Sequence, residues 1–336
     1  MSAADAPLIE LIDVHKSYGG KAAADGLTLS VRRGECVVLL GPSGSGKSTA
    51  LKLINRLVTC DRGEVRFAGR DVRSVPPEPL RRRMGYAIQS IGLFPHWSVA
   101  RNVATVPALL GWPRGRIEAR VDELLGLVGL PPADFRACRP HELSGGQQQR
   151  VGVARALAAD PEVLLMDEPF GALDPLTRQE LQRELARIQR TLAKTVVLVT
   201  HDVDEALRLA TRIVLMDGGR VVQQAAPLEL LHAPASEWVS EFLGRDELGL
   251  RRLALQTVGE RMRPPLPAAP AGSAHATPPG GPPLAADATL RHALVQFLAQ
   301  RRERLEVADA DGRLVGVLHL PDLLGQDTAG VPPRDG

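Results

Sequence analysis

Residues 36–48 read Cys-Val-Val-Leu-Leu-Gly-Pro-Ser-Gly-Ser-Gly-Lys-Ser, an apolar run followed by a glycine-rich loop. The loop fits the pattern G-x-x-x-x-G-K-[S/T], in which glycines let backbone N–H groups converge on phosphate oxygens. The pattern predicts a buried strand, the loop, and a helix that begins near Lys47 and directs its positive end at the phosphates. Lys47 would add a positive charge, and the Ser48 hydroxyl would bind Mg²⁺. The residues predicted to bind nucleotide are Gly41, Pro42, Ser43, Gly44, Ser45, Gly46, Lys47, Ser48 and Thr49.

Two acidic residues follow a second apolar run. Residues 163–166 are Val-Leu-Leu-Met, and Asp167 and Glu168 come directly after them. Like charges at the end of a strand repel, so two carboxylates there indicate two separate roles. We expect Asp167 to bind Mg²⁺ and Glu168 to polarise the water that attacks the γ-phosphate. Taken alone, the segment equally fits an exposed acidic turn after a core strand.

Single polar residues follow two further predicted strands. Gln89 comes after the stretch 84–88, and His201 follows the run 195–200. Ligands of open α/β folds gather at the carboxyl ends of parallel strands, which is where both residues would lie. A lone histidine or glutamine there is usually structural, so each gains its meaning from the other motifs.

Residues 143–150 read Leu-Ser-Gly-Gly-Gln-Gln-Gln-Arg and form a second candidate phosphate-binding element. A helix that opens at Ser144 would direct its glycine backbone and the positive end of its dipole at an anion. We expect this element to complete a nucleotide site together with a loop of the kind found at residues 41–48.

Composition limits the class of protein. The 336 residues carry 41 basic and 39 acidic side chains, a net charge of +2, which provides no general reason to expect nucleic acid as a partner. Aromatic residues make up only 3%, which favours a core of aliphatic side chains with helices packed on a buried parallel sheet. The three cysteines lack C-x-x-C spacing and indicate free thiols in a reducing cytosol. No run approaches the roughly 20 apolar residues that span a bilayer, and the N-terminus lacks the features of a signal peptide, so any membrane role is expected from outside the bilayer.

The order of the motifs predicts an α/β fold. Residues 8–40 alternate apolar runs with turn signals, which favours an antiparallel β layer before the loop. Residues from about 91 to 159 contain amphipathic Leu-rich stretches and few strands, and we expect an inserted helical subdomain there. The runs 163–166 and 195–199 predict parallel strands, and residues 213–223 predict a closing hairpin. The predicted fold class is therefore α/β, with a buried parallel sheet, an N-terminal antiparallel β layer and an inserted helical subdomain. This order resembles that of a P-loop NTPase with a RecA-like parallel sheet.

The C-terminal third has a different composition. Residues 262–288 are dominated by Pro, Ala and Gly, which predicts a semi-extended linker. An α-β-β-α pattern follows, and because about forty residues bury little core, we expect this module to need a partner surface. Its predicted elements are a helix near 290–299, strands at 305–308 and 314–320, a turn at 309–312 and a short helix from 321. The predicted organisation is a nucleotide-binding unit over 1–245, a linker region over 246–285, a small α/β module over 286–325 and a tail over 326–336.

Taken in order, these motifs resemble the ATP-binding cassette (ABC) family over roughly residues 8–245. Residues 41–48 are similar to the Walker A loop, Gln89 to the Q-loop glutamine and Tyr18 to the aromatic residue that stacks on adenine. Residues 172–174, with Asp174, are similar to the D-loop, and His201 to the switch histidine. Asp167 and Glu168 resemble the Walker B pair. The family signature corresponds to Leu143, Ser144, Gly145, Gly146 and Gln147.

The resemblance implies a head-to-tail dimer with ATP between the Walker A loop of one chain and the signature of the other. Ser144 and Gly146 would then contact the γ-phosphate of the ATP bound to the opposite subunit. Hydrolysis would remove this bridge and reopen the dimer. Glu168, His201 and Gln89 are the implied catalytic residues, and the implied Mg²⁺ ligands are Ser48, Gln89 and Asp167. No catalytic position departs from the family pattern, so an active ATPase that uses ATP and Mg²⁺ is expected.

Weaker similarities indicate the kind of transporter. The stretches 89–104, 168–174 and 241–253 are similar to bacterial importers of quaternary amines such as glycine betaine, choline or carnitine. This implies a peripheral subunit at the cytoplasmic face of the bacterial inner membrane. Its implied partners are a second ATPase subunit, an integral-membrane permease and, indirectly, a substrate-binding protein, but no nucleic acid. A homodimer is expected, and whether the second cassette is an identical chain stays open. Residues 286–325 are similar to a single CBS motif, with Gly-Arg-Leu-Val-Gly-Val at 312–317 as its recognisable strand.

Several alternatives stay open at this point. The cargo could be another small solute, and the single CBS-like motif could either pair with that of a second chain or be a remnant. A soluble cassette ATPase without a transport role usually carries two cassettes or a long coiled-coil insertion, and neither is present. A nucleotide sensor without turnover is opposed by Glu168 and His201.

Overall fold

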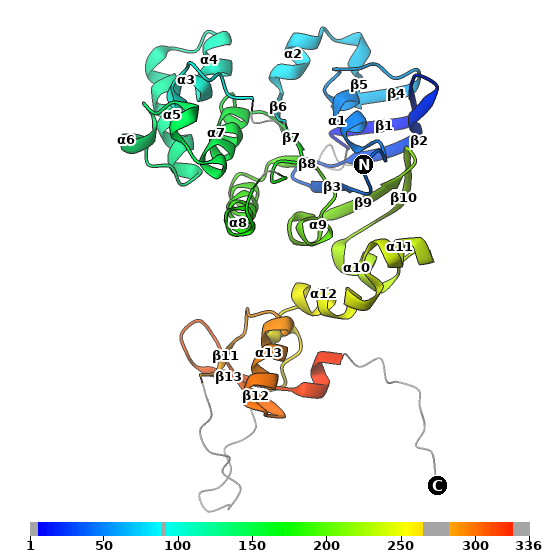
Figure 1. The fold of residues 1–336 in the computed structure, drawn as a ribbon, viewed down its shortest axis with the longest axis vertical. Helices are drawn as coiled ribbons and strands as arrows, with labels where there is room; N and C mark the ends of the chain where they lie inside the picture. The colour runs from blue at the N-terminus through cyan, green and yellow to red at the C-terminus, as the bar shows by residue number, and fades with distance from the viewer. Residues whose placement is uncertain (1–5, 89–91, 172, 265–281, 325–336) are drawn as a thin grey trace, which may run out of the picture. The chain divides into compact units, whose positions relative to one another are not determined.

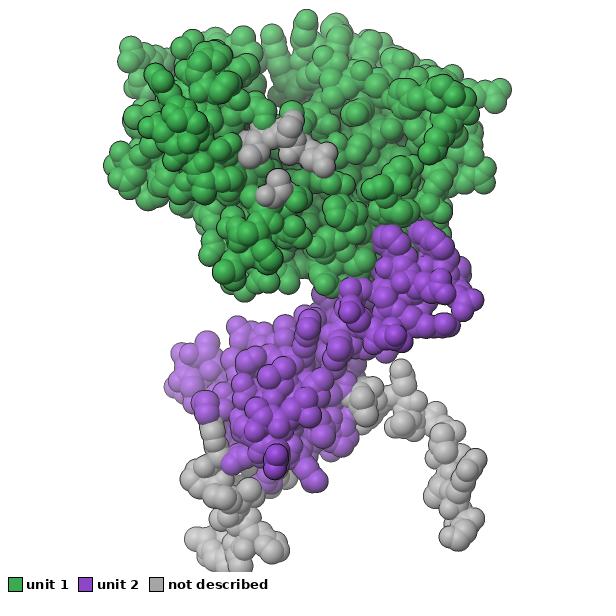
Figure 2. Space-filling model, viewed as in Figure 1, with its two compact units in different colours: residues 1–230 green, residues 231–336 purple. Residues whose placement is uncertain are grey.

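The computed structural model describes residues 6–88, 92–171, 173–264 and 282–324. Its contacts divide the chain into two compact units, residues 1–230 and residues 231–336 (Figure 2). Within the described ranges, no helix is both long enough and apolar enough to cross a membrane.

A six-stranded sheet forms the centre of the first unit, in the order β10-β9-β3-β8-β7-β6 (Figure 1). All neighbouring strands are parallel except β10, which pairs antiparallel with β9. Every residue of β3 and β8 is buried, as expected for strands covered on both faces. The parallel sheet and its closing hairpin are therefore confirmed. The strands are β3 (Cys36–Leu40), β6 (Met84–Ala87), β7 (Val163–Asp167), β8 (Thr195–Thr200), β9 (Arg212–Asp217) and β10 (Arg220–Ala225).

A four-stranded antiparallel sheet, in the order β2-β1-β4-β5, forms the predicted N-terminal layer. Strands β1 and β2 form a hairpin whose register places Ile9 opposite Val31 and Tyr18 opposite Lys21. The elements of this layer are β1 (Ile9–Tyr18), β2 (Lys21–Val31), β4 (Arg62–Phe67) and β5 (Arg70–Asp71), followed by η1 (Val72–Ser74) and α2 (Pro77–Arg82).

Helix α1 (Lys47–Ile54) joins the two sheets and contacts strands of both. Its buried Leu51 lies in one apolar cluster with Leu8 of the N-terminal layer and Leu39 of the central sheet. Helices α8 (Pro175–Leu192) and α9 (Val203–Leu209) lie on the other side of the central sheet (Figure 1). The loop before α1 therefore sits where the two layers meet.

A helical subdomain is inserted between β6 and β7. These two strands are parallel neighbours, so the chain leaves and re-enters the sheet at one edge (Figure 1). The described residues between them form helices and no strand, which confirms the predicted insertion. Val99, Leu124 and Val151 are fully buried and build its core. Its helices are α3 (Val99–Val103), α4 (Thr105–Leu109), α5 (Arg114–Leu127), α6 (Pro132–Phe135), η2 (Pro140–Glu142) and α7 (Gly145–Leu157).

The second unit contains a three-stranded sheet in the order β11-β12-β13, covered by helices. The predicted α-β-β-α order is confirmed, whereas its similarity to a CBS motif stays a prediction. The last helix of the first unit, α10 (Pro227–His232), crosses the boundary between the units. The remaining elements are α11 (Glu237–Phe242), η3 (Arg245–Glu247), α12 (Leu248–Leu255), η4 (Val258–Glu260), β11 (Leu284–Ala285), α13 (Leu290–Gln300), β12 (Arg304–Ala308), β13 (Leu314–His319) and η5 (Leu320–Leu324).

Part of the predicted linker belongs to this second unit. Residues 246–264 contain α12 and η4, and Val258 is fully buried in the same cluster as Leu290 and Phe297. The backbone of Arg263 also pairs with Val317 of β13. The physical reason is the small size of the α-β-β-α pattern, which needs the preceding segment to complete a core. The Pro-rich part, 265–281, lies outside the described residues.

Candidate functional site

The glycine-rich loop connects β3 to α1, as predicted. Gly46 has a φ of 98°, and a Cβ atom there would lie 2.2 Å from the carbonyl oxygen of Ala23 in β2. A Cβ atom on Gly41 would lie 2.1 Å from the carbonyl oxygen of Met216 in β9. Two loop glycines are therefore required by neighbouring backbone, whereas the sequence reasoning assigned all of them to phosphate contacts.

Lys47 is buried and folds back over this loop. Its Nζ donates hydrogen bonds to the carbonyl oxygens of Gly41 and Pro42, both at 2.8 Å, and to Ser45 Oγ at 3.3 Å. Burial lowers the pKa of the amine, while the nearby carboxylates of Glu168 and Asp167 raise it. The ammonium is thus held at the first helical residue, where phosphate oxygens would meet it.

Ser48 and Asp167 meet across 119 residues of sequence. The Ser48 hydroxyl donates to Asp167 Oδ1 at 2.8 Å, because α1 begins next to the carboxyl end of β7. Burial raises the pKa of Asp167, and the hydrogen bond from Ser48 partly offsets it. A hydroxyl and a carboxylate side by side are the hard oxygen ligands that Mg²⁺ prefers, so these residues fit the ion.

Glu168 and His201 also come together, from the ends of β7 and β8. His201 Nδ1 lies 3.2 Å from Glu168 Oε1, and the Glu168 N–H donates to the carbonyl oxygen of Val199 at 3.0 Å. Glu168 adopts a left-handed conformation with a φ of 45°, which is uncommon for a residue with a side chain. Such strain persists where surrounding structure enforces it, and it often marks functional sites.

One cavity of about 480 Å³ brings most of the predicted nucleotide residues together. Glu168, Tyr18 and the tip of the glycine-rich loop contribute to its wall, and Tyr18 is 47% exposed. The β1–β2 hairpin also supplies residues that the sequence reasoning missed, and the Gly19-Gly20 turn after Tyr18 is the signal that could have indicated them. The lining residues are Tyr18, Lys21, Ala22, Ala23, Ser43, Gly44, Gly46, Lys47, Ser48, Thr49 and Glu168.

The residues of the signature lie on the helical subdomain and do not line this cavity. Ser144 is the N-cap of α7, as predicted, and exchanges hydrogen bonds with Gln147 in a capping box. Gly145 is exposed, and a Cβ atom there would meet no atom of the described chain within 4 Å. Gly146 is buried, and a Cβ atom there would lie 2.2 Å from Thr177 Cγ2 of α8.

The remaining predicted residues have separate outcomes. Asp174 is the N-cap of α8, where its Oδ1 accepts from the N–H groups of Leu176 and Thr177 at 3.1 Å. Hydrogen bonds with Thr177 lower the pKa of the Asp174 carboxyl. Gln89, predicted as a catalytic residue and Mg²⁺ ligand, and Ala172 of the D-loop lie outside the described residues.

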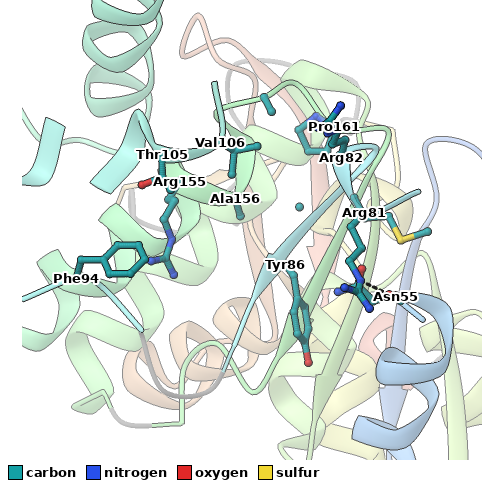
Figure 3. Close-up of a pocket in the computed structure, with 13 residues that line it drawn as sticks. Asn55, Arg81, Arg82, Tyr86, Phe94, Thr105, Val106, Arg155, Ala156 and Pro161 are labelled. Atoms are coloured by element: carbon teal, nitrogen blue, oxygen red, sulfur yellow. Dashed lines mark hydrogen bonds between the residues drawn. The ribbon is translucent and has the colours of Figure 1, made fainter. Parts of the chain in front are cut away.

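A second cavity of about 300 Å³ lies between the central sheet and the helical subdomain (Figure 3). Tyr86 of β6 and Val106 of α4 contribute apolar surface, and Arg81, Arg82 and Arg155 bring positive charge to its walls. Arg81 is held by a hydrogen bond from Nε to the carbonyl oxygen of Asn55 at 3.2 Å. Burial raises the pKa of Tyr86 to about 12, so its hydroxyl stays neutral.

Comparisons with known proteins agree with these motifs. A family model described as ABC transporter matches residues 24–171. The chain is 56% identical over 317 residues to the glycine betaine uptake system ATP-binding protein YehX of Escherichia coli (strain K12), which covers 94% of this chain and 99% of that protein. It is 44% identical over 311 residues to the glycine betaine/carnitine/choline transport ATP-binding protein OpuCA of Bacillus subtilis (strain 168), which covers 92% of this chain and 77% of that protein.

A solved structure shares the fold of the first unit. The dimeric ATP-binding cassette MJ0796, in a post-hydrolysis state bound to ADP and Pi, is 32% identical with a TM-score of 0.59. The match covers 65% of this chain and 98% of that chain. A relative is 56% identical along 94% of this chain, and the glycine-rich loop lies beside Asp167, while Glu168 contacts His201. The protein therefore belongs to the ATP-binding subunits of the ABC transporter family.

Proposed function

We propose that the chain is the ATP-hydrolysing subunit of a bacterial importer for glycine betaine or another quaternary amine. The proposed hydrolysis rests on the position of Glu168. Its side chain lines the phosphate-loop cavity, and its Oε1 lies 3.2 Å from His201 Nδ1. The proposed transported solute is supported by the two relatives described above, whose names include glycine betaine. The runner-up is an importer for another small solute.

Hydrolysis would proceed by attack of a water oxygen on the γ-phosphorus as the bond to the bridging oxygen of ADP breaks. Glu168 would accept hydrogen bonds from this water and polarise it. With Nδ1 against Glu168, the other ring nitrogen of His201 is the one that could reach the γ-phosphate. Lys47 would exchange its carbonyl partners for phosphate oxygens and offset their negative charge.

Mg²⁺ would be held by Ser48 and Asp167, whose oxygen atoms lie 2.8 Å apart. When bound, the ion would neutralise charge that develops on the phosphate oxygens. Ser48 positions the Asp167 carboxylate for this role, and Gln89 is a further proposed ligand. The proposed site sits at the start of α1, where the helix dipole also favours the phosphates.

The ATP site would be completed by the signature of a second, identical chain. Gly145 supports this proposal, because it is exposed and its Cβ position is open within the described chain. A phosphate bound to a second chain could therefore approach the N-terminus of α7 closely. ATP would bridge two chains, and its hydrolysis would let them separate.

A permease would receive this motion at the cytoplasmic face of the inner membrane. We assign the permease contact to the cavity of Figure 3, because its apolar floor is bordered by Arg81, Arg82 and Arg155. This charge would complement a carboxylate on a cytoplasmic segment of the permease. Arg82→Glu should weaken stimulation of the ATPase by the permease and leave hydrolysis by the isolated subunit unchanged. Arg70→Glu, on the exposed strand β5, is the matched control, and an equal loss in both variants would argue against this cavity.

The catalytic assignment is tested with Glu168→Gln. This variant should bind ATP, lose turnover by at least about a hundredfold and accumulate an ATP-bound dimer in size-exclusion chromatography. Hydrolysis near the wild-type rate would refute the role of Glu168.

The composite site is tested by mixing two inactive variants. Ser144→Arg blocks the signature, and Lys47→Ala disables the phosphate loop. In a mixed dimer one ATP site keeps both intact halves, so part of the activity should return. An inactive mixture would argue against the shared site. Uptake of labelled glycine betaine, choline and sulfate by cells that carry the complete transporter would distinguish the two cargo classes.

A further inference from the structure

The first turn of α8 contacts the signature directly. Thr177 Cγ2 occupies the space next to Gly146, where a Cβ atom would lie only 2.2 Å from it. The other side-chain atoms of Thr177 are farther away, with Cβ at 3.6 Å and Oγ1 at 3.9 Å from the same position. A displacement of the N-terminal end of α7 therefore pushes on Thr177, because closely packed contacts transmit movement with little compression.

Arg178, the next residue, extends from this turn toward the switch histidine. Its Nη2 donates to the carbonyl oxygen of Leu173 at 3.3 Å, and its Nη1 lies 3.4 Å from Asp202 Oδ2. Asp202 follows His201 directly and is the N-cap of α9, with Oδ1 accepting from the Glu205 N–H at 3.0 Å. Arg178 therefore ties the D-loop backbone to the residue that sets where α9 begins.

Glu205 is a second carboxyl group near the Arg178–Asp202 pair, and its environment decides whether it competes with Asp202 for Arg178. Its side chain is only 4% exposed, and within the part of the chain that the structure describes, its Oε1 has no hydrogen-bond partner. Burial, followed by the nearby charge of Asp202, raises the pKa of Glu205 to about 8. The neutral Glu205 leaves Asp202 as the carboxylate that competes for the Arg178 guanidinium at neutral pH.

We propose that Thr177 and Arg178 form a positioning link between the signature and the switch histidine of the same chain. This inference rests on the proposed function. In a head-to-tail dimer the signature serves the partner's ATP, while His201 serves the chain's own ATP. The link makes the position of His201 at one site depend on whether ATP holds the signature at the other. Coupling through a contiguous chain of packed and hydrogen-bonded groups is a known physical route.

The contact with the signature is tested by a compensating pair of substitutions in the full chain. Gly146→Ala should reduce turnover by roughly tenfold or more, because its methyl displaces the first turn of α8. Thr177→Ser removes the Cγ2 atom, and with it the packing contact on Gly146, but keeps the hydroxyl, so it should lower turnover by only about threefold. The double variant should recover to within about threefold of Thr177→Ser. A folded double variant that is no faster than Gly146→Ala would overturn the link, and so would a Gly146→Ala variant with wild-type turnover.

The connection to His201 is tested with a double-mutant cycle. Arg178→Ala removes the bridge, and Asp202→Asn keeps the helix cap but removes the charge. Each should lower kcat by roughly tenfold with KM for ATP within about twofold, and the double variant should be no slower than either single one. Arg178→Lys, which keeps the charge on Asp202, should recover part of the rate. Losses that multiply in the double variant, or a change in KM and melting temperature with kcat unchanged, would overturn the link.

His201→Ala separates this inference from the function on which it rests. If His201→Ala retains turnover, the proposed catalytic assignment itself fails. If His201→Ala abolishes turnover while Arg178→Ala has the wild-type kcat, only the positioning link fails.

Discussion

Replacing Glu205 with glutamine should remove a pH-dependent loss of stability from this protein. Glu205 lies at the start of α9, is 4% exposed and has a pKa raised from 4.5 to about 8. The main cause is burial, to which the charges of Asp202 and Glu168 add, whereas Thr200 and Arg178 act in the opposite direction.

The sign of the effect follows from proton linkage. Below pH 4.5 the carboxyl is neutral in both the folded and the unfolded chain, so it does not reduce the free energy of unfolding. Between pH 4.5 and about 8 the unfolded chain loses the proton while the folded chain keeps it, so the free energy of unfolding falls. At 1.36 kcal/mol per pH unit, this interval corresponds to about 5 kcal/mol, and about 3 kcal/mol of it is lost by pH 7.

Urea denaturation followed by tryptophan fluorescence measures this difference, with Trp97 and Trp112 in the first unit and Trp238 in the second. Glu205→Gln should show a decline in stability between pH 5 and 8 that is smaller than that of the wild type by several kcal/mol, because the amide does not titrate. Asp204→Asn replaces an exposed carboxylate in the same turn with an amide and is the matched control for the substitution itself. Equal slopes for Glu205→Gln and the wild type would refute the reasoning.

Three further predictions concern the nucleotide cavity and the loop after β6. Tyr18→Ala should weaken ATP binding by about tenfold and Tyr18→Trp should preserve it, since stacking on a base contributes about 1–3 kcal/mol. Unchanged binding of a fluorescent ATP analogue by the alanine variant would contradict the stacking. Ser48→Ala should raise the Mg²⁺ concentration that gives half-maximal hydrolysis by roughly tenfold, and a magnesium titration that matches the wild type would exclude Ser48 as a ligand. Asn102 is fully buried, accepts a hydrogen bond from the Phe94 N–H and donates one to the Phe94 carbonyl oxygen. Asn102→Ala should therefore lower the free energy of unfolding by about 2 kcal/mol, and unchanged stability in a denaturant titration would show that these bonds contribute little.

Most elements of the fold could be predicted from local patterns. The continuous apolar runs at β3, β7 and β8 indicate strands buried on both faces, and the turn at 217–219 indicates the β9–β10 hairpin. These signals depend on residues close together in sequence. Helix α12 lies within the predicted linker region and could not be derived from local patterns, because its packing depends on residues of the later module such as Leu290 and Phe297.

The candidate site was predictable as a set of motifs but not as a set of contacts. The residue types at positions 41–48, 143–147, 167–168 and 201 indicate the chemistry, since phosphate, metal and water each require particular groups. The Ser48–Asp167 and Glu168–His201 pairs and the link through Arg178 could not be derived from spacing. They depend on which strands are neighbours in the sheet, and β7 and β8 are separated in sequence by the whole of α8.

The sequence by itself determined the family, the order of the elements and the chemical groups of the candidate nucleotide site. These features lie in short motifs, which can be recognised from residues that are close together in the chain. Only the tertiary structure decided why Gly41, Gly46 and Gly146 must be glycine, since each faces an atom far away in sequence. It also decided that Glu205 is buried beside Asp202 and Arg178. The physical reason is that desolvation and close packing are properties of a position in space, and they arise only when distant segments fold against one another.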